Sequence, residues 1–264
     1  MPVEKITGRH NPLLGKIRKL IRSAAYRREC GVFICEGKKL LQEALLWNAA
    51  VSEVLFCGET DLPPLPPETR VFQLPEELLR SVGTFDAPQG LLFTARMPEN
   101  KPSAGGNRFL ILQNIQDPGN VGTVLRSADA FGCAGVFLVG SCADPFQPKT
   151  VRASMGAIFR CPLRITTEEE LFAFLRAEQV PVWAAALAEG ESDIRSELPR
   201  RVAFAVGNEG SGLTEAFLSR CERIVKIPMQ PRCESLNAAT AAALLLWEAY
   251  RRSPEADGQI RKEG

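Results

Sequence analysis

The feature that most constrains this chain is a regular alternation of short apolar runs and longer helical patterns after residue 107. The apolar runs do not alternate with polar residues, which indicates strands that are buried on both faces. Buried strands that alternate with helices form a parallel sheet covered by helices. The strand-like runs are residues 109–113, 135–139, 182–186, 202–206 and 223–227, and the helical segments include 121–131, 168–178 and 236–252. We therefore predict an α/β domain over residues 108–252.

A smaller α/β unit is expected over residues 1–96. Its helical patterns cover residues 12–25 and 37–47, and its strand-like runs cover 32–35, 53–57 and 91–95. Residues 97–107 are polar and contain two prolines and two glycines, which is typical of a linker. Residues 253–264 lack a core pattern and are expected to form a flexible tail.

The composition is that of a folded protein, with 45% hydrophobic and 24% charged residues. The longest apolar stretch, 241–247, is far shorter than the roughly 20 residues of a membrane span, and residues 1–9 lack the apolar core of a signal peptide. The 8 cysteines are therefore expected to be reduced thiols. Cys30, Cys35 and the single His10 make a poor zinc site by spacing. We expect a soluble cytoplasmic protein without a metal.

Basic side chains are concentrated in the first 40 residues, although the whole chain is nearly neutral, with 32 basic and 31 acidic residues. A basic arm on a neutral protein suggests an anionic partner, most simply a phosphate backbone. The alternative is a solvated amphipathic helix, because apolar residues recur at helical spacing among the charges. The cations that we assign to a nucleic-acid partner are Arg9, Arg18, Lys19, Arg22, Arg27, Arg28 and Lys38.

The first of three motif segments, residues 111–132, reads as a strand, a turn at 117–119 and a helix that Asn120 would cap. The start of a helix after a strand is where α/β proteins bind anionic ligands. Arg126 lies on the polar face of this helix and could reach such a ligand. The alternative is a surface arginine that pairs with Asp129 one turn later.

The second segment, residues 204–213, places a glycine-rich loop directly after an apolar strand. Glycine permits positive φ angles and close approach of the backbone to a flat ligand. The spacing is not that of the dinucleotide fingerprint, and glycines after a strand can also form a simple tight turn. The loop residues of interest are Gly207, Asn208, Glu209 and Gly210.

The third segment, residues 227–250, predicts a strand end at Ile227 and Pro228, a short loop, and a helix that Ser235 would cap. The helix is rich in alanine, so another backbone could pack closely against it. Helix propensity alone would also explain the alanines.

In this order and spacing, the three segments resemble the signature motifs of the SpoU, or TrmH-like, RNA 2′-O-ribose methyltransferases of the SPOUT superfamily. The intervening RASMGAIFR at 152–160 looks like a further family segment, and residues 1–96 resemble the small α/β sandwich that often precedes the catalytic domain. The resemblance implies a trefoil knot in the parallel-sheet domain and a homodimer whose active site takes residues from both subunits. It also implies ribosomal or transfer RNA as the substrate and a site without metal.

The resemblance further implies S-adenosylmethionine as the cofactor. It places Gly207, Ile227 and Leu236 at the cofactor, with Asn208, Glu209, Gly210, Pro228 and Met229 around it. Arg126 is the residue implied for the ribose hydroxyl. Because an arginine pKa lies above about 12, we expect Arg126 to orient the ribose and its phosphate and to stabilise developing alkoxide charge rather than to act as a base. Asn120, Ser235 and Asn237 are expected to be positioning groups, and Glu209 could hold Arg126 or the substrate.

Three other functions compete with this reading. A non-catalytic RNA-binding or ribosome-assembly protein of the same fold would not bind the cofactor. A related enzyme that methylates a base nitrogen would release a methylated base on acid hydrolysis. A nucleotide-dependent oxidoreductase is suggested only by the α/β alternation.

His10 is disfavoured as a base because it lies in the basic arm, and Cys233 is not needed because ribose oxygen attacks a methyl group directly.

Overall fold

The computed structural model describes residues 2–83, 90–99, 101–186 and 192–254. The chain divides into two compact units. The first contains residues 1–99 together with 144–160, and the second contains 100–143 with 161–264. Residues 144–160 therefore pack with the first unit although they lie between two strands of the second. The boundary expected at 97–107 did not anticipate this insertion.

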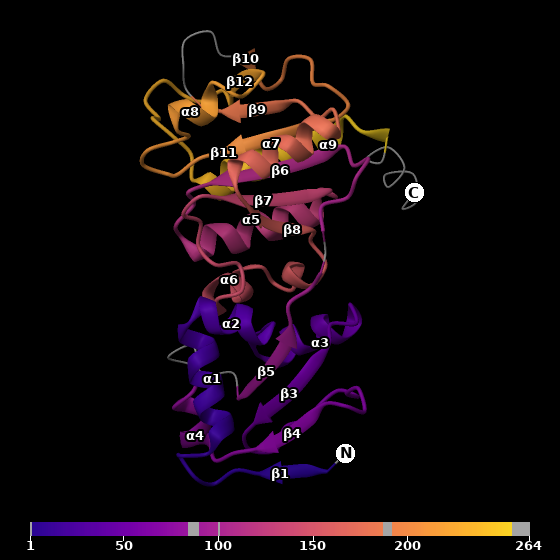
Figure 1. The fold of residues 1–264 in the computed structure, drawn as a ribbon, viewed down its shortest axis with the longest axis vertical. Coiled ribbons are helices and arrows are strands. Elements are labelled where there is room, and N and C mark those ends of the chain that lie inside the picture. Colours follow the sequence, from indigo (N-terminus) through magenta and orange to yellow (C-terminus); the bar gives the residue numbers. More distant parts are fainter. Residues whose placement is uncertain (1, 84–89, 100, 187–191, 255–264) are drawn as a thin grey trace. The chain divides into compact units, whose positions relative to one another are not determined.

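The first unit is built on a five-stranded sheet in the order β1-β4-β3-β5-β2, of which Figure 1 labels β1, β4, β3 and β5. Strands β1, β4 and β3 are parallel, whereas β5 runs antiparallel to β3 and β2. The elements of this unit are β1 (Val3–Lys5), α1 (Pro12–Arg22), α2 (Ala24–Cys30), β2 (Val32–Glu36), α3 (Lys38–Leu46), β3 (Val51–Phe56), β4 (Arg70–Gln73), α4 (Glu76–Arg80), β5 (Leu91–Arg96), α6 (Pro148–Ala153) and the short 3₁₀ helix η1 (Ala157–Phe159).

Apolar side chains of the first unit bury both faces of its sheet. One face packs against α1 and α4, where Leu14, Ile17 and Leu20 are buried. On the other face, the ring of Phe33 lies 5.2 Å from that of Phe146 and 6.0 Å from that of Phe159. Helices thus cover both sides, which agrees with the expected α/β sandwich.

The basic arm forms two helices where the sequence predicted one. Helix α1 begins after Asn11, whose side chain accepts a hydrogen bond from the Leu13 amide. It ends at Arg22 because Ser23 adopts an extended conformation and caps α2, accepting from the Tyr26 amide. Arg9, Lys19, Arg22, Arg28 and Lys38 are exposed, and Arg18 is half-buried.

Arg27 was predicted to contact RNA, and this prediction is wrong. Only 3% of the residue is exposed. Its Nε and Nη2 donate to Asp144 Oδ2, at 3.1 and 2.5 Å, and Nη1 donates to the carbonyl oxygens of Leu20 and Ile21. The helical pattern could not reveal this role, because the partner carboxylate lies more than one hundred residues later in the chain.

We predict that Asp144→Ala destabilises the protein by about 3–5 kcal/mol, because it leaves the buried Arg27 charge without its partner. Urea denaturation measures the change. The matched control is Glu4→Ala, which removes the exposed Arg70–Glu4 pair and should cost less than about 1 kcal/mol. Equal, small losses in both variants would contradict the structural role of the Arg27–Asp144 pair.

The second unit contains a seven-stranded, fully parallel sheet in the order β10-β12-β9-β11-β6-β7-β8 (Figure 1). The expected parallel α/β domain is therefore confirmed. Its elements are β6 (Arg108–Gln113), α5 (Pro118–Ala130), β7 (Gly135–Val139), β8 (Leu163–Thr166), α7 (Glu168–Ala177), β9 (Val182–Ala185), β10 (Ser192–Asp193), β11 (Val202–Val206), α8 (Glu215–Leu218), β12 (Arg223–Lys226) and α9 (Ala238–Arg251).

Alternate residues of the central strands face two helical layers. Phe109 and Ile111 of β6 and Ala203 of β11 belong to the core that α7 and α8 complete. The intervening residues point to the opposite face, where α9 packs against β11 and β6 and beside α5. Strand β6 lies between β7 and β11, so the order of strands along the chain reverses at β6. Ligands of open α/β sheets bind at the carboxyl ends of strands near such a reversal.

The 8 cysteines form no disulfide. Burial raises the pKa of the Cys133 thiol to about 12, and burial likewise raises that of Cys221 to about 12, so both remain protonated at neutral pH. Over the residues that the structure describes, no helix is long and apolar enough to cross a membrane.

Candidate active site

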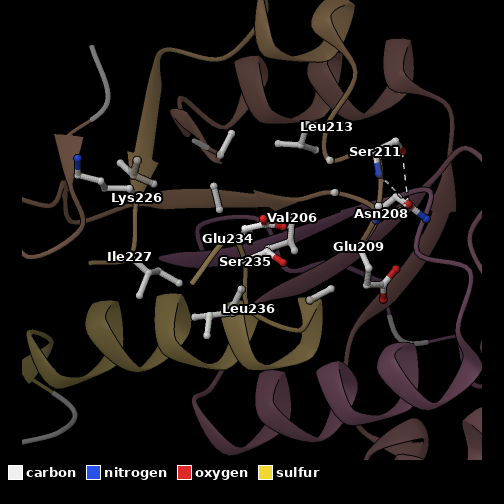
Figure 2. Close-up of a pocket in the computed structure, with 18 of the residues that line it drawn as sticks. Val206, Asn208, Glu209, Ser211, Leu213, Lys226, Ile227, Glu234, Ser235 and Leu236 are labelled. Carbon is white, nitrogen blue, oxygen red and sulfur yellow. Dashed lines mark hydrogen bonds between the residues drawn. The ribbon is translucent and has the colours of Figure 1, made fainter. Parts of the chain in front are cut away.

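A cavity of about 410 Å³ lies at the carboxyl ends of β9, β11 and β12. Because these strands are parallel, the loops that follow them meet at one edge of the sheet. Figure 2 shows Asn208, Glu209 and Ser211 at one end of the cavity, Lys226 and Ile227 at the other, and Ser235 between them. The lining residues are Ala185, Ala186, Val206, Gly207, Asn208, Glu209, Gly210, Ser211, Gly212, Leu213, Leu218, Val225, Lys226, Ile227, Met229, Glu234, Ser235, Leu236, Ala238 and Ala241.

The loop after β11, which we call the glycine loop (Gly207–Gly212), is closed on itself. Asn208 and Gly212 exchange backbone hydrogen bonds of 3.1 and 2.9 Å. The side-chain oxygen of Asn208 also accepts from the backbone amides of Gly210 and Ser211. A Cβ on Gly207 would lie 2.3 Å from the carbonyl carbon of Gly212. Glycine at 207 is therefore required by the close approach of two backbone segments.

The loop after β12 and the start of α9 also form part of the cavity lining. Ser235 and Leu236 line the cavity, as do Ala238 and Ala241 of the helix. The prediction that Ser235 caps this helix is wrong. Asn237 is the cap, and its side-chain oxygen accepts from the amides of Ala239 and Thr240.

Helix α5 meets the glycine loop through a chain of carboxamides. Its cap is Asp117, which accepts from the Asn120 amide, so Asn120 is not the cap that the sequence suggested. The Asn120 side chain is instead free to donate from Nδ2 to Glu209 Oε1. Asn237 Nδ2 donates in turn to Asn120 Oδ1, at 2.9 Å. One network therefore joins residues from all three motif segments.

Arg126 lies outside this cavity and this network. Its side chain is exposed, and within the described part of the chain it forms no hydrogen bond or ion pair. The pairing with Asp129 that the sequence left open is not present. Glu209, which was expected to hold either Arg126 or the substrate, accepts from Asn120 instead. Among the described residues, the guanidinium of Arg126 is thus exposed and has no partner.

The chemistry of the cavity suits a flat, neutral ring with polar groups at its edges. Leu213, Ile227, Met229 and Leu236 provide apolar side chains, and the glycine loop provides backbone. Carboxylates and hydroxyls stand at the rim, from Glu209, Ser211, Glu234 and Ser235. Among the described residues, no group of three or more His, Cys, Asp or Glu side chains is arranged to hold a metal ion.

Most residues expected at the cofactor line the cavity, and Pro228 is the exception. Pro228 is exposed and does not contribute to the lining. Sequence reasoning missed Ala185 and Ala186, at the end of β9, because this strand carries no motif. It also missed Lys226 and Glu234, although Glu234 directly precedes Ser235 in the third segment.

The exposed cations of the basic arm differ in their present contacts. Arg9 pairs with Glu77, Lys38 lies 3.3 Å from Asp61, and both pairs are exposed. Arg18 Nη2 lies 3.3 Å from the Ser81 hydroxyl. Exposed ion pairs are worth less than about 1 kcal/mol, so these contacts restrain the two side chains only weakly.

Each half of the chain matches the model of a known protein family. The model described as the SpoU rRNA Methylase family matches residues 107–247, and the model described as the MRM3-like substrate binding domain matches residues 11–92. The 23S rRNA (guanosine(2553)-2′-O)-methyltransferase RlmP of Bacillus subtilis is 34% identical over 232 residues, which cover 87% of this chain and 92% of that protein. The 23S rRNA (uridine(2479)-2′-O)-methyltransferase of Streptomyces viridochromogenes is 29% identical and covers 94% of this chain and 92% of its own length.

Solved structures of rRNA methyltransferases are similar to this chain over almost its whole length. The AdoMet-bound rRNA methyltransferase of Sinorhizobium meliloti superposes with a TM-score of 0.82 at 30% identity, over 94% of this chain and 98% of that one. The SpoU methyltransferase AviRb of Streptomyces viridochromogenes, in complex with AdoMet, superposes with a TM-score of 0.81 at 27% identity, over 92% and 98%. With the second and third motif segments at one cavity, the first joined to them by hydrogen bonds, and a family match over more than half its length, the chain belongs to the SpoU rRNA methylase family.

Proposed function

We propose that the protein transfers a methyl group from S-adenosylmethionine to a ribose 2′-hydroxyl of ribosomal RNA. The observation that carries the proposal is a cavity that the second and third motif segments line and to which Asn120 of the first segment is hydrogen-bonded through Glu209. Arg126 of the first segment is exposed on α5 and unpaired within the described part of the chain. Relatives that are named as 23S rRNA 2′-O-methyltransferases favour ribosomal over transfer RNA and ribose over base.

The cavity fits the cofactor in size and in chemistry. Its volume of about 410 Å³ lies in the range of roughly 300–1,000 Å³ that is usual for small-molecule sites. Ile227, Met229 and Leu236 would contact the adenine ring, and the backbone of the glycine loop would approach it closely. S-adenosylmethionine supplies, when bound, an electrophilic methyl group on a sulfonium. Glu209 and Glu234 place two negative charges at the cavity against the one positive charge of Lys226, and a net negative charge suits a cationic cofactor.

The residues of this chain would contribute orientation and charge. Arg126 would hold the ribose and its adjacent phosphate through its planar fork of donors and stabilise the negative charge that develops on the 2′-oxygen. The hydroxyl proton would leave to phosphate or to water, because arginine stays protonated. Glu209, Asn120 and Asn237 would keep the polar side of the site in a fixed geometry.

We further propose a homodimer in which Arg126 serves the cavity of the partner subunit. Residues 120 and 126 are separated by about 9 Å along the helix axis, at about 1.5 Å per residue. They are also about 120° apart around the axis, at 3.6 residues per turn, so Arg126 and Asn120 lie on different faces of α5. Helix α9 also exposes Leu244 and Trp247, at 41% and 47%, and the Trp247 ring lies 5.7 Å from that of Phe131. Such an exposed apolar face is suited to a second copy of the chain.

The test of the proposed function is methyl transfer to RNA. Purified protein is incubated with radiolabelled S-adenosylmethionine and total RNA, and the RNA is then digested with alkali. A 2′-O-methyl group blocks alkaline cleavage, so label in alkali-resistant dinucleotides of ribosomal RNA is the expected result. Label in mononucleotides would indicate base methylation. Absence of both labelling and cofactor binding would indicate a binding protein.

The basic arm yields a prediction about RNA affinity. Arg18 and Arg22 lie one turn apart on α1, so Arg18→Gln with Arg22→Gln should weaken RNA binding. The dependence of log K on log salt should become flatter by about 1.5, at about 0.7–0.9 for each lost phosphate contact. Binding is measured by fluorescence anisotropy at several salt concentrations.

The control for this prediction is Arg176→Gln, which removes an exposed arginine of α7 outside the arm. It should leave the salt slope unchanged. An unchanged slope in the double variant of the arm would contradict its assignment to phosphate. Arg9, Lys19, Arg28 and Lys38 stay in the proposed RNA surface, whereas Arg27 does not.

Several expectations remain predictions. They are the trefoil knot, the cytoplasmic location, the domain limits drawn at residues 96 and 108, and the tail at 253–264. All of the tail except Ser253 and Pro254 lies outside the described residues.

A further inference from the structure

Gln113, the last residue of β6, is a buried polar residue that the proposed chemistry does not use. Only 1% of it is exposed. Its Nε2 donates to Glu168 Oε1 at 2.7 Å and to Thr214 Oγ1 at 3.1 Å, and its Oε1 accepts from the Thr214 amide at 2.9 Å. Both amide hydrogens therefore have acceptors, and the side chain has one orientation. A buried carboxamide that is satisfied in this way fixes the groups that it contacts.

Thr214 connects Gln113 to the cavity. It caps α8, accepting from the Phe217 amide, and it directly follows Leu213, which lines the cavity. The backbone of Gly212 and Leu213 is also what Gly207 packs against. The exit of the glycine loop is therefore attached to the end of β6 by two hydrogen bonds from one side chain.

The entrance of the glycine loop is attached to the same strand end. Asn208 Nδ2 donates to the carbonyl oxygen of Asn114, the residue after Gln113, at 3.0 Å. Asn114 has a positive φ of 59°, which turns the chain sharply at this point. Two consecutive residues at the end of β6 thus hold the glycine loop at both of its ends.

The charges around Gln113 come from α7 and from the segment after α8. Arg220 Nη1 lies 3.5 Å from Glu168 and 3.9 Å from Glu169, and its guanidinium covers the ring of Phe172. Glu222 follows nearby in the chain, and the Cys221 thiol, with its pKa raised to about 12 by burial, does not titrate near neutral pH. A carboxylate at 113 would face Glu168 directly.

We propose that Gln113 is a positioning residue that holds the glycine loop in its cofactor-binding conformation. The inference rests on the proposed function, because it assumes that the cavity takes S-adenosylmethionine. Gln113 contacts no reacting atom, so it should control the KM for the cofactor and leave kcat unchanged. A residue that served stability alone would lower the active fraction without changing the KM.

The decisive variant is Gln113→Glu, which keeps the size of the side chain and the acceptor for the Thr214 amide. It loses the donor to Glu168 and places two carboxylates side by side. Close carboxylates share a proton at low pH and repel at high pH. The affinity for S-adenosylmethionine should therefore fall about tenfold or more between about pH 5 and about pH 8, while wild type stays nearly flat.

The rescue variant is Gln113→Glu with Glu168→Gln, which exchanges donor and acceptor across the same 2.7 Å bond. It should restore most of the affinity and remove the pH dependence. Glu169→Gln, which removes the neighbouring exposed carboxylate, is the control and should leave binding unchanged. Binding is measured by titration calorimetry, and thermal unfolding verifies that each variant is folded.

The result for wild-type protein distinguishes a failure of the proposed function from a failure of the role of Gln113. If wild type does not bind S-adenosylmethionine, the proposed function fails. If wild type binds it and Gln113→Glu binds equally well at every pH, the role of Gln113 fails. Weaker binding that the exchanged pair does not restore would also overturn the role.

Discussion

Replacing Arg126 by alanine is expected to reduce the rate of methyl transfer by about 10²–10³-fold, the usual effect of removing a donor that stabilises developing negative charge. The affinity for S-adenosylmethionine should stay near that of wild type, because Arg126 does not line the cavity. Single-turnover kinetics with excess enzyme measures the rate, and calorimetry measures cofactor affinity.

Two comparisons make the result specific to the guanidinium. Arg126→Lys keeps the charge but loses the planar fork of donors, so its rate should lie between those of wild type and Arg126→Ala. Arg176→Ala, at an exposed position of α7, should have the rate of wild type. If Arg126→Ala lost cofactor affinity instead of rate, the assignment of Arg126 to the substrate would be wrong.

The partner-subunit geometry can be tested by mixing two impaired variants at a concentration of S-adenosylmethionine that saturates wild type but leaves the Gly207→Ala cavity largely empty. Subunits that carry Arg126→Ala have an intact cavity, and subunits that carry Gly207→Ala have an intact arginine. If Arg126 acts on the partner's cavity, a mixed dimer contains one complete site, and a statistical mixture recovers about a quarter of wild-type activity. If Arg126 acts within its own subunit, the mixture stays impaired.

Replacing Gly207 by alanine should strongly weaken cofactor binding while the protein stays folded. The added Cβ would lie 2.3 Å from the carbonyl carbon of Gly212 and 2.4 Å from the Leu213 amide nitrogen, and neither backbone atom can move without opening the loop. Forcing an extra methyl group into such a contact costs about 1–3 kcal/mol, so affinity should fall by up to about 100-fold. Calorimetric titration with S-adenosylmethionine measures the loss.

Gly210 offers a comparison inside the same loop. A Cβ at this position would meet only the Asn208 side-chain oxygen, at 3.5 Å, which is an ordinary contact. Gly210→Ala should therefore retain the conformation of the loop and lose far less affinity than Gly207→Ala. Similar losses in both variants would show that steric closure at Gly207 is not what shapes the cavity.

The parts of the fold that the sequence predicted are those with the strongest local signal. The fully apolar runs at Gly135–Val139 and Val202–Val206 match strands β7 and β11 in both bounds. The short strands β1, β4, β8 and β10 were not predicted, because they are exposed or brief and carry little apolar pattern. Pairing with a neighbouring strand, rather than their own composition, makes them strands.

The lining of the cavity was predictable where a segment resembles a family motif. The glycine loop and Leu236 were expected at one site on that resemblance, and they line one cavity. The sequence could not show which of several polar residues near a helix start accepts the capping bonds. Asp117 and Asn237 took that role, and Asn120 and Ser235 did not. Arg27 was assigned to RNA for the same reason, because a charge does not reveal whether a distant carboxylate will bury it.

The side chain of Asn237 divides its two polar atoms between separate tasks, since its oxygen begins α9 and its nitrogen donates to Asn120. Few residues can replace it without loss. Serine or threonine would preserve the helix start but not the reach of the amide donor, and glutamine would retain a donor but fit the helix start poorly. Natural selection for the helix and for the site therefore acts on the same residue. A protein that had lost its catalytic role would still need asparagine or a similar capping residue here, because the start of the helix depends on it. Retention of this residue in a relative is for that reason weak evidence that the relative is still an enzyme.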